Sequence, residues 1–105
     1  MSASTPEDLD PRVEDTDAGP VVHLHGELDL ASAPQLEEAI AAATTKGPLP
    51  VTLDLSQVTF IDSSALRALV RAGRELAAEG RVLQIGPRSE VVSRVLEMTQ
   101  LDQQA

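Results

Sequence analysis

The chain has 105 residues, a length that suits one small domain, and it carries a net charge of −9 with a single aromatic residue, Phe60. Nucleic acids and anionic membranes need clustered cations, and bases also need stacking rings, so we expect no direct nucleic-acid partner. Cysteine is absent, no signal peptide is evident and no apolar run reaches the roughly 20 residues of a membrane span, so we expect a cytoplasmic protein without membrane insertion.

The first 20 residues are acidic: six acids against one arginine give this stretch −5 of the net charge of −9. Such a composition favours a mostly flexible segment, so we predict flexible residues at 1–20 and a folded domain at 21–105. A short edge strand around 12–15, turning at 17–19, is compatible with the turn residues there.

Three strand and helix units are predicted after residue 20. Apolar and polar residues alternate from Val21 to Asp29 and again from Val51 to Ser56, which indicates two strands. Ser32 and Gln35 have the spacing of a capping box, which predicts a helix that ends near Lys46. The next predicted element is a helix that ends at Gly80, with residues at helical spacing that are Leu66, Leu69, Val70, Gly73, Leu76 and Ala77. A strand at 81–86 and a helix capped by Ser89 follow.

This alternation predicts an α/β fold with a mainly parallel sheet and right-handed strand-to-helix crossovers. Because the strands alternate instead of being apolar throughout, we expect the helices mostly on one face of the sheet. The N-terminal edge strand would be antiparallel.

Asp62-Ser63-Ser64 lies where the second predicted strand meets its helix. The first N–H groups of a helix lack intrahelical partners and its dipole is positive there, so this position favours an anion such as phosphate. Taken alone, the same three residues are more often a plain helix cap.

Two motifs in combination go further. Gly26-Glu27-Leu28-Asp29 ends one strand, and Phe60-Ile61-Asp62-Ser63-Ser64-Ala65-Leu66 spans the next strand-to-helix junction. With these motifs the chain resembles the STAS family, specifically bacterial anti-sigma factor antagonists, from about Val21 to Leu101. The resemblance implies a STAS-type fold and a non-enzymatic regulator of sigma-factor-dependent transcription that works by partner switching, without catalytic residues, cofactor or metal.

In such antagonists the first serine after the motif aspartate, here Ser63, is phosphorylated by an anti-sigma factor serine kinase, and a PPM-type phosphatase reverses this. The unphosphorylated form binds the kinase and frees its sigma factor. The partner-binding residues implied by the resemblance are Gly26, Glu27, Asp29, Asp62, Ser63, Ser64 and Ala65. Arg67 is added because it lies one helical turn from Ser63. Ala65 stands where the family commonly has glycine, which leaves less room for a partner's backbone. Asp29 can equally be a turn and cap residue.

Arg67, Arg71 and Arg74 share one face of the predicted helix. They would attract an acidic kinase surface or pair with a phosphate, or else form a solvated face with an Arg71–Glu75 pair.

Other interpretations remain. A non-phosphorylated STAS scaffold subunit of a membrane transport or stress-signalling complex would use the same surface constitutively, and a small-molecule or nucleotide sensor is a further class. His23 and His25, with Glu27, could supply metal ligands, but a polar strand face is the favoured interpretation. Ser63 has no base placed beside it by any motif and the chain has no Gly-rich phosphate loop, so we do not predict an enzyme.

Overall fold

The computed structural model of the chain describes residues 9–99. Its elements are β1 (Arg12–Thr16), β2 (Gly19–Leu28), α1 (Ala33–Thr44), β3 (Val51–Ile61), α2 (Ser63–Ala78), β4 (Leu83–Arg88) and α3 (Glu90–Thr99). The predicted strand and helix order is confirmed. Residues 1–8 of the predicted flexible segment, and Leu101 at the end of the family resemblance, lie outside the described residues.

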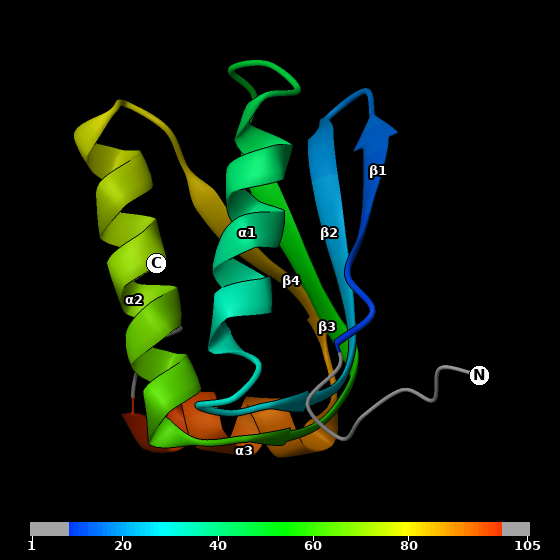
Figure 1. The fold of residues 1–105 in the computed structure, drawn as a ribbon, viewed down its shortest axis with the longest axis vertical. Coiled ribbons are helices and arrows are strands. Elements are labelled where there is room, and N and C mark those ends of the chain that lie inside the picture. The colour runs from blue at the N-terminus through cyan, green and yellow to red at the C-terminus, as the bar shows by residue number, and fades with distance from the viewer. Residues whose placement is uncertain (1–8, 100–105) are drawn as a thin grey trace.

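The four strands form one sheet in the order β1-β2-β3-β4. β1 pairs with β2 antiparallel, and β2, β3 and β4 are parallel to one another. Figure 1 shows α1 and α2 side by side over one face of the sheet, with α3 lying across its lower end. The predicted α/β fold, with a mainly parallel sheet and an antiparallel N-terminal edge strand, is confirmed.

The core is built from aliphatic side chains. The strands bury Val22, Leu24, Leu28, Val51, Leu53, Leu55, Val58 and Ile61, α1 buries Leu36 and Ile40, and α3 buries Val92 and Leu96. Each fully buried Leu, Val or Ile stabilises the fold by about 1.5–3 kcal/mol relative to exposure. Phe60 is 46% exposed, so the one aromatic ring lies outside this core.

The buried stripe of α2 is rotated relative to the predicted one. Leu66, Leu69 and Leu76 are buried as expected, but Ala77 is exposed. The places beside the leucines are taken by Ala65, Ala68 and Ala72. Methyl side chains let the helix approach its neighbours closely, since protein interiors pack at crystal-like density.

Residues 9–20, which the sequence assigns to a mostly flexible segment with a possible edge strand at 12–15, pack against the rest of the domain and contain β1. Leu9 is fully buried, and its backbone carbonyl accepts a hydrogen bond from His25 N–H at 3.0 Å. Leu9 N–H donates to Gln35 Oε1 at 2.8 Å, so Gln35 is engaged away from the predicted capping box, and Ser32 makes no side-chain cap bond. Composition does not reveal that this segment is ordered, because most side chains of edge strand β1 are exposed and the strand is held by backbone pairing with β2.

An ion cluster joins three strands on the polar face of the sheet. His23 Nδ1 lies 2.8 Å from Asp54 Oδ2, and His23 Nε2 lies 2.8 Å from Glu14 Oε1. Only the protonated imidazole can donate from both nitrogens. The hydrogen bonds from Glu14 and then Asp54 raise the pKa of His23 above its usual 6.5. The two carboxylates thus favour the protonated form of His23 between β1 and β3. Within residues 9–99, no three His, Cys, Asp or Glu side chains are arranged to hold a metal ion.

This cluster predicts a pH-dependent contribution to stability. Because the pKa of His23 is raised on folding, its contribution is fully present below pH 6.5 and is lost as the pH rises through the raised folded value. Burial raises the pKa of Asp54, but hydrogen bonds from Ser56 and His23 outweigh burial and lower it below the usual 3.8, so its contribution is lost only in stronger acid. We expect His23→Gln to reduce the free energy of unfolding more at about pH 5.5 than at about pH 8.5, measured by urea denaturation.

His25→Gln is the matched control, since the His25 side chain is exposed and forms no ion pair with residues 9–99. An equal loss of stability at both pH values for His23→Gln would contradict the cluster's role.

Candidate functional site

Asp62 is the cap of α2, and Ser63 is the first helical residue. Asp62 is extended, with φ −115° and ψ 178°, and its Oδ1 accepts a hydrogen bond from Ala65 N–H at 2.9 Å. The Asp62 carbonyl accepts from Leu66 N–H at 3.1 Å. Asp62 therefore does the capping, which leaves the Ser63 hydroxyl exposed and without a hydrogen-bond partner in residues 9–99.

The end of β2 lies directly beside this junction. Leu28 and Ile61 are paired in register across the parallel strands, and Asp62 N–H donates to the Leu28 carbonyl at 3.1 Å. The carboxyl ends of neighbouring parallel strands share one edge of a sheet. The structure thus brings together the segments Gly26–Asp29 and Asp62–Ser64, both of which contain predicted partner-binding residues.

Gly26 and Asp29 have conformational roles within that edge. Gly26 has φ +104°, a region that other residues rarely adopt, and it lies at a shift in the β2–β3 register. Asp29 Oδ1 accepts from Ser32 N–H at 3.0 Å, and the Ser32 hydroxyl donates to the Glu27 carbonyl at 2.7 Å. Asp29 is therefore a turn residue at the entry to α1, and a partner contact of its half-buried side chain stays a prediction.

Ser32 stabilises this turn through hydrogen bonds of its buried hydroxyl group. It is the one polar residue that is fully buried among residues 9–99, and its hydroxyl oxygen also accepts from Asp29 N–H at 3.0 Å. Sequence reasoning assigned Ser32 to a cap and missed this role. The signal was available in the spacing Asp-x-x-Ser, which lets side chains at both ends of a tight turn bond to each other's backbone.

Ala65, one of the predicted partner-binding residues, lies on the buried side of α2. Ala65 is 0% exposed and lies on the buried stripe of α2, so its methyl group points into the protein. Alanine in place of glycine therefore takes no room from the outer surface at this position. Ser63 and Arg67 are exposed, whereas Gly26, Glu27, Asp29, Asp62 and Ser64 are half-buried.

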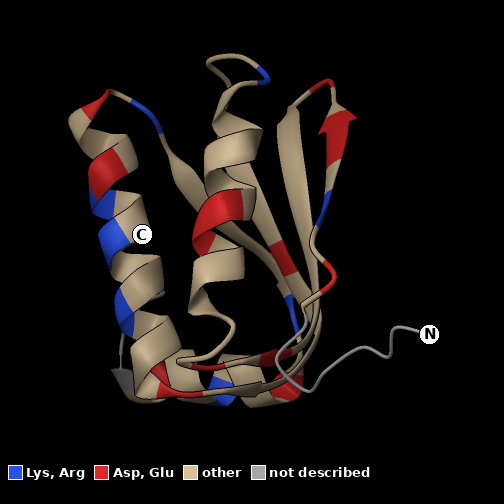
Figure 2. Cartoon of the chain, viewed as in Figure 1, with Lys and Arg blue, Asp and Glu red and all other residues tan. Residues whose placement is uncertain are grey.

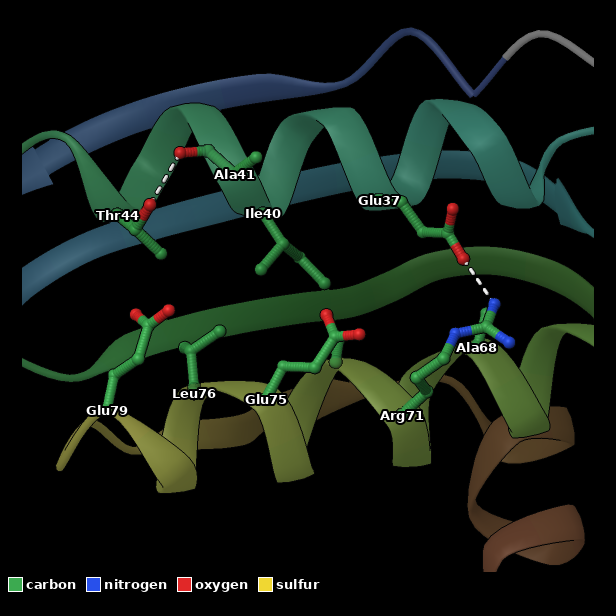
Figure 3. Close-up of a pocket in the computed structure, with 10 residues that line it drawn as sticks. Glu37, Ile40, Ala41, Thr44, Ala68, Arg71, Glu75, Leu76 and Glu79 are labelled. Atoms are coloured by element: carbon green, nitrogen blue, oxygen red, sulfur yellow. Dashed lines mark hydrogen bonds and ion pairs between the residues drawn. The ribbon is translucent and has the colours of Figure 1, made fainter.

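The three arginines of α2 lie along a surface groove that begins at Ser63. The groove is lined by Ser63, Leu66, Arg67, Val70, Arg71, Arg74, Glu75 and Ala78. Figure 2 shows cationic bands at successive turns of α2. Arg71 is paired with Glu37 of α1, with Nη2 and Oε2 2.6 Å apart, and Figure 3 shows the two side chains meeting between the helices. The expected Arg71–Glu75 pair is therefore wrong, and Arg67 and Arg74 form no ion pair with residues 9–99.

Two apolar side chains belong to the same edge of the sheet. Phe60 pairs in register with Glu27 and is 46% exposed, while Leu30 follows Asp29 and is 72% exposed. Sequence reasoning placed Phe60 in the motif but did not assign either residue to a surface. An apolar residue in a turn directly after a motif was the available signal for Leu30.

A nucleophilic serine needs a base within hydrogen-bond reach, and no imidazole or carboxylate in residues 9–99 hydrogen-bonds to Ser63. Within the same residues, no helix is both long and apolar enough to span a bilayer.

Comparison with known proteins decides the family. The family model described as "Mlab, STAS domain" matches residues 12–103. The chain belongs to the STAS domain family. The relatives of this STAS chain include the anti-sigma-F factor antagonist RsfB of Mycobacterium tuberculosis, which is 31% identical over 101 residues, 94% of this chain and 80% of the relative.

Solved structures agree with this assignment. An anti-sigma factor antagonist from Mycobacterium paratuberculosis has a TM-score of 0.82 at 33% identity, over 97% of this STAS chain and 86% of that one. Unphosphorylated SpoIIAA, also an anti-sigma factor antagonist, has a TM-score of 0.70 at 25% identity, over 89% and 83%. The phosphorylated Bacillus SpoIIAA has a TM-score of 0.61 at 26% identity, over 87% and 84%. The predicted family resemblance is confirmed.

The cap geometry predicts the effect of changing Asp62. We expect Asp62→Ala to lower the free energy of unfolding by about 1 kcal/mol, because Ala65 N–H loses its acceptor. Asp62→Asn keeps an acceptor oxygen and should stay within a few tenths of a kcal/mol of the parent protein. Urea denaturation measures both, and equal stability of the two variants would contradict the cap.

Substitution of Gly26 and of Gly73 by alanine should change stability in opposite directions. Gly26→Ala forces a side chain into φ +104° and should lower the free energy of unfolding by about 1–2 kcal/mol. In α2, a Cβ added at Gly73 meets only Leu83 Cδ2, at 3.9 Å, so Gly73→Ala should raise the same free energy by about 0.5–1 kcal/mol. Thermal and urea unfolding test these opposite signs, and a neutral Gly26→Ala would contradict the assigned backbone conformation.

Proposed function

We propose that this STAS chain is an anti-sigma factor antagonist that regulates sigma-factor-dependent transcription by partner switching. In the unphosphorylated state it binds an anti-sigma factor serine kinase, and phosphorylation of Ser63 releases it. A PPM-type phosphatase returns the chain to the binding state. The partners and the reaction belong to the cytoplasm. The observation that carries the proposal is the exposed hydroxyl of Ser63, with no base beside it, at the edge that also holds Gly26–Asp29.

The chemistry of the exposed edge supports a protein partner. Leu30 and Phe60 offer apolar area that an aqueous monomer leaves uncovered, and Arg67 offers a cation with no partner in residues 9–99. Protein interfaces combine an apolar centre with polar groups at the rim, and arginine and aromatic residues are enriched there. The relatives named as anti-sigma factor antagonists, and SpoIIAA solved in a phosphorylated and an unphosphorylated form, support the same function.

Phosphorylation would act by blocking this surface. A phosphate adds a charge of about −1.5 to −2 at pH 7 and three acceptor oxygens. The first turn of α2 tolerates negative charge, because its free N–H groups and the helix dipole favour anions. A partner docked over Ser63 would instead have to accommodate a hydrated dianion beside the Asp62 carboxylate. We therefore expect release of the partner with little refolding of the chain.

Phosphorylation by a cognate kinase is the direct test. After incubation with a candidate anti-sigma kinase and ATP, we expect mass spectrometry to place one phosphate on Ser63. Ser63→Ala should abolish it, and the neighbouring Ser64→Ala, the matched control, should retain it. Ser63→Glu should weaken kinase binding at least about tenfold in calorimetry, which corresponds to about 1.4 kcal/mol.

The opposite result has a clear meaning. No phosphate on Ser63, together with undiminished binding by Ser63→Glu, would reject partner switching. Constitutive binding of that kind would favour a scaffold subunit of a membrane transport or stress-signalling complex, which co-purification with such components would identify.

A further inference from the structure

Arg67 lies one helical turn beyond Ser63 on the same side of α2. Residues four apart on a helix are surface neighbours, with their Cβ atoms about 5–6 Å apart. Both side chains are exposed, and both line the groove that runs along α2. The Arg67 guanidinium is therefore a cation within reach of a group attached to the Ser63 hydroxyl.

Arg67 is also not engaged elsewhere in the described fold. Arg71, one turn further on, is occupied by Glu37 at 2.6 Å, whereas Arg67 forms no ion pair with residues 9–99. The carboxylate nearest to Ser63 in sequence is that of Asp62, which accepts the Ala65 N–H at 2.9 Å. Although the chain has a net charge of −9, no carboxylate of residues 9–99 pairs with the exposed Arg67.

We propose that phosphorylated Ser63 captures Arg67, so that the modification adds a dianion and at the same time withdraws a cation from the partner surface. The proposal rests on the proposed function, because it requires phosphate on Ser63. Arginine presents a planar fork of N–H donors that matches phosphate oxygens, and such charge-assisted bonds are among the stronger ones in proteins. An anion placed four residues before a cation is also the favoured order along a helix.

The capture gives Arg67 a different role in each state. In the unphosphorylated chain Arg67 is available to an acidic group of the partner. In the phosphorylated chain it binds the phosphate of its own helix, so the partner loses an attractive contact as well as meeting a new charge. Arg67 is a positioning residue for the phosphate. When it binds the phosphate, the local charge of the groove at its Ser63 end changes from positive to negative.

The test uses chain made with phosphoserine encoded at position 63, so that no kinase is needed. The ³¹P resonance is followed through the second ionisation of the phosphate, near pH 6. A neighbouring guanidinium stabilises the dianion, so we expect the midpoint to be higher in Arg67→Gln than in the parent chain by about half a pH unit. The difference should shrink with added salt.

Arg74→Gln is the matched control, since it removes the same charge from the same groove. Arg74 is eleven residues from Ser63, about 16 Å along the helix, which exceeds the screening length of about 8 Å at physiological ionic strength. Its midpoint should equal that of the parent chain. Circular dichroism checks that each exposed substitution leaves the fold unchanged.

Two outcomes would overturn the capture. Equal midpoints for the parent chain and Arg67→Gln would show that Arg67 does not bind the phosphate, and equal shifts for Arg67→Gln and Arg74→Gln would show only a general charge effect. Either outcome leaves phosphorylation of Ser63 by a kinase untouched. Conversely, absence of any kinase reaction would reject the proposed function without altering this titration.

Discussion

The parallel pairing of β2 with β3 is the constraint on which the site depends. Leu28 and Ile61 end the two strands in register, and the bond from Asp62 N–H to the Leu28 carbonyl continues the pairing into the cap of α2. Because the chain returns in the same direction after α1, two segments far apart in sequence finish at one edge. The turn that follows β2 and the first turn of α2 are thereby fixed relative to each other by backbone bonds, independently of their surface side chains.

The spacing of buried residues in β3 explains why this edge is apolar on the outside. Val51, Leu53 and Leu55 are buried at every second position, but the next buried residues are Val58 and Ile61, at steps of three. The register of β3 with both neighbouring strands shifts along this stretch. Bulges of this kind re-aim side chains near the end of a strand. As a result Phe60, the first residue of the second motif, is partly exposed to solvent, while Ile61 is buried in the core just before α2 begins.

Periodicity was sufficient to predict the order of elements and the mainly parallel sheet, since both follow from local pattern and from the topology of strand-to-helix units. What it missed depends on contacts between distant segments. Leu9 is buried through bonds to Gln35 and to β2, which an acidic composition does not reveal. The burial of Ala65 depends on how α2 is rotated about its axis relative to the sheet. Arg71 pairs with Glu37 because α1 lies alongside α2. A single-sequence pattern contains no information on those distances.

The direct passage from β3 into α2 has a consequence for the proposed phosphorylation of Ser63. Only Asp62 separates the last residue of β3 from Ser63, and both flanking segments are tied down by backbone hydrogen bonds. An enzyme that threads an extended peptide through its active-site cleft would have to unwind α2 to reach this hydroxyl. The kinase proposed above would therefore have to recognise a folded epitope assembled from two strand ends and a helix, which a short linear peptide with the same residues does not present.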